Sequence, residues 1–182
     1  MRTGEKNEFR QEEFKIRSVG EKQDLRQVAQ LADVIWKEHY TPIIGKKQVD
    51  YMLENFQSVS AMEQQMSEGM EYFLVESKDD PVGYLAFRQQ GEELFLSKIY
   101  LLDSHRGKGL GRLGMRFVES EVGDRGLSFI TLTVNKNNSG SIKAYESMGF
   151  VNEGPLETDI GGGFVMDDFL MRKKISKDQN RL

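Results

Sequence analysis

The sequence has 182 residues and no cysteine, which excludes disulfide bonds, thiolate metal sites and a cysteine nucleophile. Its formal net charge of -4 disfavours a general nucleic-acid-binding protein, because such proteins are usually basic. No apolar run approaches the ~20 residues of a membrane-spanning helix, and the polar stretch Met1 to Glu13 does not look like a signal peptide. We therefore expect a cytoplasmic protein that binds neither nucleic acid nor membrane.

The first third of the chain predicts an arm, a strand and helices. Residues 1–12 are polar and read as a flexible arm, and residues 14–19 alternate as a strand does. Apolar residues then recur at helical spacing from Leu25 to Trp36. This helix is expected to end near residues 39–42, because Pro42 disfavours helix in the residue before it.

Two more helices complete this part of the chain. Residues 48–56 repeat the helical pattern, and Ser58 or Ser60 is expected to cap a short helix through Gln65 and Met66.

After residue 70 the apolar period changes from helical to two, which predicts strands. Three strands with short turns between them indicate an antiparallel meander: 72–76, 82–88 and 94–102. A helix over 110–122 leads to a strand over 129–134, and such a connection predicts parallel pairing.

The remaining elements close the sheet. They are a helix over 139–148 that ends at Gly149, a hairpin of 150–156 with 164–171, and a frayed tail at 176–182. The sequence thus predicts one α+β domain over residues 13–175, with a mixed, mostly antiparallel twisted sheet and helices on both faces.

A glycine-rich stretch, Arg106-Gly107-Lys108-Gly109-Leu110-Gly111, follows the third strand of the meander and opens the helix over 110–122. Glycine lets the backbone approach a ligand closely, and free N–H groups at a helix N-terminus attract anions. His105, Arg106, Lys108 and Arg112 surround this turn in a chain that is acidic overall. We interpret the stretch as a pyrophosphate-binding loop.

This loop has three alternative interpretations. Gly109, Gly111 and Gly114 match G-x-G-x-x-G, but a dinucleotide fold needs an acidic residue about 20 residues later, and Val134-Asn135 supplies none. The chain has no G-x-x-x-x-G-K-[ST] motif, which excludes a P-loop. A glycine turn without a ligand stays open, although it leaves the basic side chains unexplained.

A second motif follows the strand over 129–134. Asn135 ends that strand, Asn138, Ser141, Ala144 and Tyr145 lie on the next helix, and Gly149-Phe150 begins the last hairpin. Together with the R-x-x-G-x-G loop, this order resembles the GNAT superfamily of acetyl-CoA-dependent N-acetyltransferases, over about residues 14–175. A looser likeness, to bacterial polyamine acetyltransferases, lies in the run Trp36 to Gly45 and the residues after it.

The resemblance implies acetyl-CoA as co-substrate, in a wedge between a splayed pair of parallel central strands. It puts the phosphates on the glycine loop, the pantetheine arm along the preceding strand and on Asn138, and the sulfur beside Tyr145. The implied cofactor-binding residues are Ile99, Tyr100, Leu101, Arg106, Gly107, Lys108, Gly109, Leu110, Gly111, Arg112, Asn135, Asn138, Ser141 and Ala144.

The resemblance also implies the chemistry of a direct attack by a primary amine in a ternary complex. Tyr145 is the expected general acid for the leaving thiolate, since a phenol stays protonated at pH 7; packing against the sheet is its structural alternative. A backbone N–H near Leu101 would stabilise the oxyanion. Family members often carry a glutamate as base on the strand before the loop. Here Glu93, or a water held by Ser97, is the candidate, or the amine arrives already neutral.

The acceptor pocket is expected around the connection of the first two helices. Trp36, His39 and Tyr40 lie there, and Tyr72 and Tyr84 on neighbouring strands could face the same cleft. Each has a structural alternative: core packing for Trp36, cross-strand packing for the two strand tyrosines, and bonding to helix C-terminal carbonyls for His39.

Three functions are candidates for this chain. The leading one is N-acetyl transfer to a small molecule, a polyamine or a protein amino group. A non-catalytic acyl-CoA-binding regulatory module is the alternative, and a nucleotide-dependent oxidoreductase is disfavoured by the absent acidic residue. A homodimer through the C-terminal strands, including Phe164 and Phe169, is expected from the resemblance. No metal site is expected, because His39 and His105 lack ligand spacing.

Overall fold

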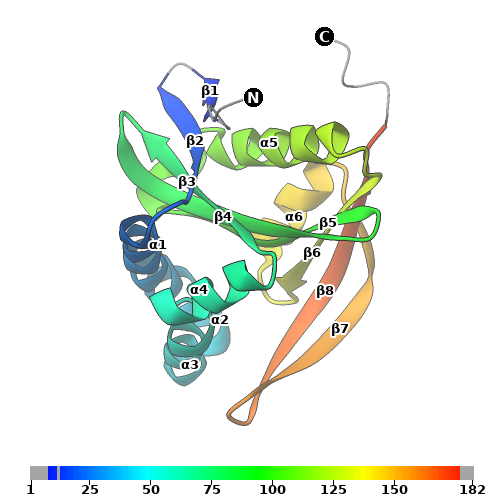
Figure 1. The fold of residues 1–182 in the computed structure, drawn as a ribbon. Helices are drawn as coiled ribbons and strands as arrows, with labels where there is room; N and C mark the ends of the chain where they lie inside the picture. The colour runs from blue at the N-terminus through cyan, green and yellow to red at the C-terminus, as the bar shows by residue number, and fades with distance from the viewer. Residues whose placement is uncertain (1–7, 12, 177–182) are drawn as a thin grey trace.

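The computed structural model describes residues 8–11 and 13–176, which form one layered arrangement of helices and strands (Figure 1). Eight strands form a single sheet in the order β1-β2-β3-β4-β5-β6-β8-β7. The strands are β1 (Glu8–Gln11), β2 (Phe14–Ser18), β3 (Glu71–Ser77), β4 (Asp80–Gln90), β5 (Glu93–Leu101), β6 (Phe129–Asn135), β7 (Val151–Gly161) and β8 (Phe164–Lys174).

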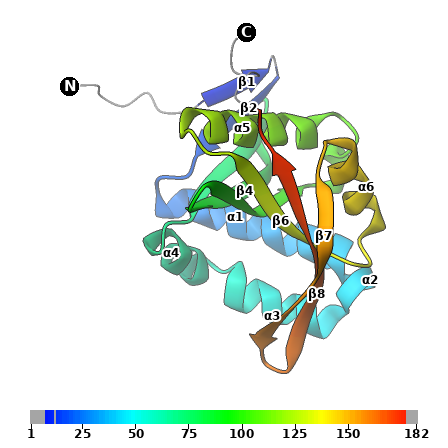
Figure 2. The ribbon, with the colours of Figure 1, turned by 90° about the vertical axis from the view of Figure 1, so that its right-hand side faces the viewer.

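Helices cover both faces of this sheet (Figures 1 and 2). They are α1 (Lys22–Ile35), α2 (Thr41–Ile44), α3 (Lys46–Phe56), α4 (Val59–Ser67), α5 (Leu110–Asp124) and α6 (Ser139–Ser147). One apolar core forms between the sheet and the helices α1, α3 and α4, and a second forms between the sheet and the helices α5 and α6. The central strands are therefore buried on both faces, which explains their nearly continuous apolar sequence.

The only parallel pair among the described strands is β5 with β6, and it is short. Glu93 to Phe95 pair with Phe129 to Thr131, and the two strands then separate. All other neighbouring strands pair antiparallel. The predicted fold class is confirmed, including helices on both faces and the splayed central pair.

The N-terminal prediction is wrong in one place. Glu8–Gln11, inside the predicted flexible arm, forms β1 and pairs antiparallel with β2. The rest of the arm, and residues 177–182 of the predicted tail, lie outside the described residues.

The prediction that Pro42 stops the first helical segment is also wrong. A π-helical turn, Trp36–Tyr40, continues α1, and α2 follows directly, with Thr41 in helical conformation at φ -55° and ψ -43°. Pro42 lies in the first turn of α2, where its missing N–H is not needed. No helix in the described part of the chain is long and apolar enough to cross a membrane.

Candidate active site

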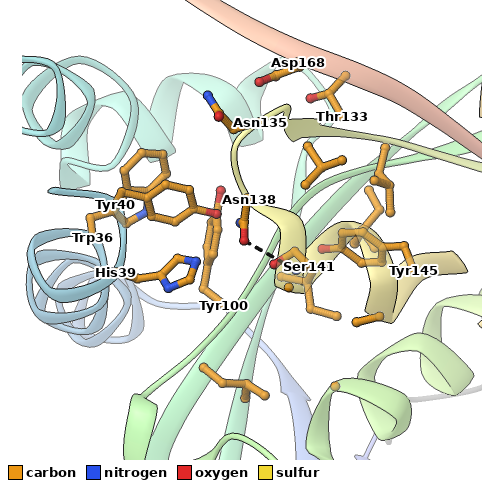
Figure 3. Close-up of a pocket in the computed structure, with 18 of the residues that line it drawn as sticks. Trp36, His39, Tyr40, Tyr100, Thr133, Asn135, Asn138, Ser141, Tyr145 and Asp168 are labelled. Carbon is orange, nitrogen blue, oxygen red and sulfur yellow. Dashed lines mark hydrogen bonds between the residues drawn. The ribbon is translucent and has the colours of Figure 1, made fainter. Parts of the chain in front are cut away.

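The separation of β5 from β6 opens a cavity of about 440 Å³ (Figure 3). A bulge contributes to it, because Ala86 of β4 pairs with Lys98 while Phe87 pairs with Leu96, which leaves Ser97 as an extra residue on β5. The cavity is lined along its length by residues of both strands: Leu96, Ser97, Ile99, Tyr100, Leu101, Leu132, Thr133, Val134 and Asn135. Beyond Phe95, the edge of β5 that faces β6 has no strand partner within the described sheet.

The glycine loop forms one end of the cavity. Gly107 and Gly109 have positive φ angles of 72° and 84°, and Gly109 directly precedes α5. Arg106 ties this loop to its surroundings, since its Nε donates to the carbonyl of Leu101 at 3.3 Å and its Nη1 donates to Nδ1 of His39 at 2.8 Å. Of the loop residues, Arg106, Gly107 and Gly111 line the cavity.

Gly111 is not required by contacts within the protein. A methyl group built there would meet no protein atom within 4 Å, and the φ of Gly111 is not in the left-handed region. Gly114, one turn later, differs, because a methyl group there would lie 3.2 Å from Cδ1 of Ile99. Gly114 thus serves helix–strand packing, whereas Gly111 leaves open space beside the helix N-terminus, where free N–H groups bind anions.

The helix α6 forms the second wall. Asn138 is buried, and its Oδ1 accepts a hydrogen bond from the backbone N–H of Ser141 at 3.4 Å, which caps the helix. Ser141, Ala144 and Tyr145 line the cavity from this helix. Burial, followed by the charge interaction with Tyr40, raises the pKa of Tyr145, so its phenol keeps its proton at neutral pH.

The π-helical turn forms the opposite wall with an aromatic cluster (Figure 3). Trp36 stacks on Tyr40 with ring centroids 4.4 Å apart, and Tyr100 meets the two rings edge-on at 5.5 and 5.9 Å. All three residues line the cavity. Burial raises the pKa of Tyr40 to about 12, so this wall carries no charge at neutral pH. π-helical turns are frequent at functional sites.

His39 lines the cavity, as expected of an acceptor-pocket residue, and it also bonds to the glycine loop. Arg106 can only donate, so the Nδ1 of His39 must be an unprotonated acceptor. Burial, followed by the charge of Arg106, lowers the pKa of His39, which keeps the ring neutral. His39 therefore connects the acceptor wall to the glycine loop, and no contact with helix C-terminal carbonyls is needed to explain it.

Asp168 on β8 completes the far end of the cavity and was missed by the sequence prediction. It pairs across the sheet with Asn135, so both side chains lie on the face that also carries Thr133. Asp168 is only 4% exposed and lines the cavity. Desolvation raises the pKa of its carboxyl to about 6, opposed by a hydrogen bond from the Thr133 side chain. The sequence did contain a pattern that could have indicated this residue. Asp167 and Asp168 are adjacent in a strand, where successive side chains point to opposite faces, so one of the two carboxylates must face the inner side of the sheet.

Several predicted site residues are not among those that line the cavity. Glu93 pairs with Nη2 of Arg172 at 2.7 Å at the start of β5, where the parallel strands are still joined. Leu110 is in the core, Arg112 donates to Oγ of Ser147 at 3.3 Å, and Lys108 and Gly109 are exposed.

The acceptor-pocket assignment of two tyrosines is corrected by their burial. Tyr72 and Tyr84 belong to the core under α1, α3 and α4. Their hydroxyls donate to Oε1 of Gln65 at 2.7 Å and of Gln57 at 3.0 Å, away from the cavity. Their observed role is packing within the sheet and core, which was the structural alternative to the acceptor pocket. Side chains on both faces of β3 and β4 are buried. The sequence pattern of these strands therefore did not indicate which face meets the cavity.

Comparison with known proteins agrees with this geometry. The Acetyltransferase (GNAT) family matches residues 29–150. Streptothricin acetyltransferase of Streptomyces lavendulae is 38% identical over 69 residues, which cover 38% of this chain and 35% of that relative. The match thus spans about a third of the relative's length.

Solved structures share the fold. PaiA N-acetyltransferase from Thermoplasma acidophilum, in complex with coenzyme A, has a TM-score of 0.75 at 20% identity, over 88% of this chain and 98% of that one. A chimera of spermidine N-acetyltransferase SpeG from Vibrio cholerae and hSSAT has a TM-score of 0.67 at 22% identity, over 93% and 99% of the two chains. Because the family match extends from α1 through the glycine loop to the end of α6, and so over more than half of the chain, the protein belongs to the GNAT family of acetyltransferases.

Proposed function

We propose that this protein transfers an acetyl group from acetyl-CoA to a primary amine. The observation that carries the proposal is a continuous cavity between the separated strands β5 and β6. It has an anion-binding loop at one end and a carboxylate beside aromatic rings at the other. Donor and acceptor could therefore lie in one cavity and react directly, as a ternary complex requires.

The donor half has the groups that coenzyme A needs. The N–H groups at the start of α5, with Arg106 and Gly107, suit the pyrophosphate, and the open edge of β5 suits the amides of the pantetheine arm. Asn138 and Ser141 line the same stretch. The complex of PaiA with coenzyme A supports this assignment through the shared fold.

The chemistry follows from the groups around the middle of the cavity. Acetyl-CoA supplies a thioester that an amine can attack. Tyr145 and Leu101 line the cavity, which supports Tyr145 as the acid that protonates the leaving thiolate and a backbone N–H near Leu101 as the donor to the oxyanion. Ser97 lines the cavity and could hold a water, whereas the ion pair of Glu93 argues against its use as a base.

The acceptor class is drawn from the relatives as well as from the cavity. The named acceptors of two similar proteins are streptothricin and spermidine. An aromatic wall with a carboxylate at its end suits an alkyl amine of this kind.

A cytoplasmic location and a homodimer are further parts of the proposal. The cysteine-free sequence supports the location. Exposed apolar side chains on the C-terminal hairpin, Val151, Leu156 and Val165, support the dimer. Phe164, predicted for that interface, instead packs on Tyr51 at 5.1 Å, and Phe169 packs against the core.

The test is release of coenzyme A from acetyl-CoA in the presence of separate amines: streptothricin, spermidine, single amino acids, aminoglycosides and short peptides. We expect turnover with at least one alkyl amine and none without an amine. Tight binding of acetyl-CoA with no release across the whole panel would contradict the proposal and favour a regulatory acyl-CoA-binding module.

A further inference from the structure

We propose that Asp168 binds the ammonium group of the acceptor and takes the proton that the nitrogen loses before it attacks. This inference rests on the proposed acetyl transfer and adds to it the base and the charge of the substrate. The acceptor would be a primary alkylammonium ion rather than a neutral or acidic molecule.

The position of Asp168 supports this role. Its cross-strand pairing with Asn135 puts its side chain on the cavity face of the sheet, beyond the point where β5 and β6 separate. In Figure 3, Asp168 and Thr133 lie at the end of the cavity, with the rings of Trp36 and Tyr40 on one side and Tyr145 on the other. An amine held there lies between the predicted acid and the aromatic wall.

The carboxylate of Asp168 has no direct ion pair among the described residues, and the only cation that acts on it, Lys136, is paired with Asp167. Only 4% of the surface of Asp168 is exposed to solvent. In the part of the chain that the structure describes, no cation forms an ion pair with it. Lys136 pairs with Asp167, and its charge lowers the pKa of Asp168 less than burial raises it. A buried carboxylate that faces a cavity and lacks a cationic partner is costly to maintain, and a cationic ligand would remove that cost.

The aromatic wall favours the same kind of ligand. Tyr40 and Tyr100 lie close enough to Asp168 for its charge to raise their phenol pKa values further. Both phenols stay neutral, and their rings, with Trp36, can attract a cation through their faces. Carboxylate and rings together recognise an alkylammonium group, and they would repel an anion.

The proton transfers balance as follows. One N–H bond of the ammonium breaks and its proton passes to the carboxylate of Asp168, which leaves a neutral amine. The amine nitrogen forms a bond to the thioester carbonyl carbon, and the C–S bond breaks. The thiolate takes the phenolic proton of Tyr145, and the second proton lost by the nitrogen replaces it. Asp168 then releases its proton to solvent, so the net products are an amide, coenzyme A and one proton.

The pH dependence should report this carboxyl group. The charged and titratable groups that face it are Asp167 and Lys136 beside it on the sheet, Tyr40 on the π-helical turn and Tyr100 on β5. The two phenols titrate far above neutrality. His39 lines the same cavity and has a pKa lowered from its ordinary value, so the acidic limb in kcat/KM expected near pH 6 is assigned to Asp168 by its loss in Asp168→Asn.

The experiment compares the wild type with Asp168→Asn and with the control Asp167→Asn, all as the full chain. We expect Asp168→Asn to lower kcat/KM for an alkyl amine by about 10²- to 10³-fold and to remove the acidic limb, because general base catalysis contributes at that scale. Asp167→Asn should keep the acidic limb and most of the wild-type kcat/KM, with the limb moved to lower pH because the charge of Asp167 raises the pKa of Asp168. Calorimetric binding of coenzyme A should be the same in all three.

A second acceptor separates base catalysis from a structural role. Hydroxylamine is largely unprotonated at neutral pH and needs no base before attack, so Asp168→Asn should keep most of the wild-type rate with it. An equal loss with both acceptors, or wild-type kinetics with the alkyl amine, would overturn the inference while leaving acetyl transfer intact. No transfer by the wild type to any amine would contradict the proposed function itself.

A third variant tests the assignment of the acidic limb. Thr133→Val removes the hydroxyl whose hydrogen bond lowers the pKa of Asp168, so the limb should move to higher pH. An unmoved limb in Thr133→Val would show that another group titrates there and would overturn the assignment.

Discussion

Tyr145 has the two properties that an acid for the leaving thiolate needs, because it lines the cavity and its raised pKa keeps it protonated. Its ring also packs edge-on against Phe150 at 5.7 Å, a contact that phenylalanine would preserve. We therefore expect Tyr145→Phe to lower kcat by about 10²-fold, the usual scale for one proton-transfer group, with the dissociation constant of coenzyme A unchanged. Steady-state kinetics and calorimetry on the same preparation would check both values. An unchanged kcat would show that the phenol takes no part in the reaction.

A substitution at Gly111 should change protein stability and coenzyme A affinity in opposite directions. Gly111→Ala replaces glycine in the first turn of α5, where alanine is the better helix former, so the free energy of unfolding should rise by a few tenths to about 1 kcal/mol. The new methyl group would project into the space that the cavity leaves for the ligand, so the affinity for coenzyme A should fall by about tenfold or more, equal to about 1.4 kcal/mol.

Gly114→Ala is the matched control for this variant. Its methyl group meets Ile99 rather than the cavity, so the control should lose stability instead. Urea denaturation and calorimetry measure the two quantities. Wild-type affinity in Gly111→Ala would mean that the ligand does not approach this turn.

Among single residues, the sequence predicted the site residues that belong to a local motif. It missed the site residues whose position depends on how distant strands pair. Arg106, Gly107, Gly111, Asn138 and Tyr145 follow from motif order and line the cavity. Asp168 and Thr133 do not, because which face of a strand meets a cavity depends on register with a strand far away in the chain. His39 was predicted as a site residue, but its hydrogen bond to Arg106 was not. The two residues are 67 positions apart, so no local sequence pattern indicates this contact.

The element that carries Asp168 is held at its tip by α3. Tyr51 of α3 donates its hydroxyl to the carbonyl of Ile160 at 2.7 Å, and Gln48 donates Nε2 to the carbonyl of Val165 at 3.0 Å. The turn lies so close that a methyl group at Gly162 would be 2.6 Å from the ring of Tyr51. The hairpin of β7 and β8 is thus fixed against the helical layer.

Gly162→Ala should release this contact, and Gly163→Ala is its control. Both glycines have positive φ, at 61° and 79°, so alanine strains both, but only Gly162 also faces Tyr51. We expect Gly163→Ala to cost about 1 kcal/mol of unfolding free energy and Gly162→Ala about 1–2 kcal/mol more, the usual cost of overpacking. Urea denaturation measures this difference. Equal losses would mean that backbone strain alone matters and that the contact with α3 contributes nothing.

Element prediction succeeded where periodicity was long and failed where tertiary contacts decide. The helices at 46–56 and 110–124 and the central strands follow their apolar periods. The hairpin strands extend to 11 residues each, longer than their sequence indicated, because pairing and the α3 contact support polar positions. The π-helical turn could not be predicted from local sequence. Its aromatic rings, Trp36 and Tyr40, pack on Tyr100 of the sheet, so the turn depends on a tertiary contact.

The stability of the whole molecule should depend on pH through Asp168. Its pKa is 3.8 when unperturbed and about 6 in the fold, so the folded state binds the proton more tightly. The free energy of unfolding therefore falls as pH rises through this window, by roughly 3 kcal/mol at about 1.4 kcal/mol per pKa unit. Asp168→Asn lacks this penalty and should be more stable than the wild type at pH 8, by roughly 1–3 kcal/mol.

Urea denaturation at pH 4 and pH 8 measures the effect, with Asp167→Asn as the control. The two variants and the wild type should have similar stability at pH 4, where the carboxyl group is protonated in the fold. A wild type that is the more stable protein at pH 8 would show that the carboxylate already has a favourable partner inside the protein.

At the scale of the whole molecule, the fold class could be predicted from the order of the elements along the chain. A meander, a strand–helix–strand connection and a final hairpin leave few ways to assemble one sheet, and the observed order of strands is one of them. The pairing of β8 between β6 and β7 and the early separation of β5 from β6 are set by packing across the layers, so only the family resemblance anticipated the cavity.

The most direct test of the account is to measure the acetylated amine by mass spectrometry and free coenzyme A in the same reaction of the full chain with acetyl-CoA and an alkyl amine. The account predicts one acetylated amine for each coenzyme A released, and no release without the amine. Coenzyme A released without acetylated amine would mean hydrolysis rather than transfer, and bound acetyl-CoA that is never consumed would mean that the cavity binds the donor without reacting; either result contradicts the account.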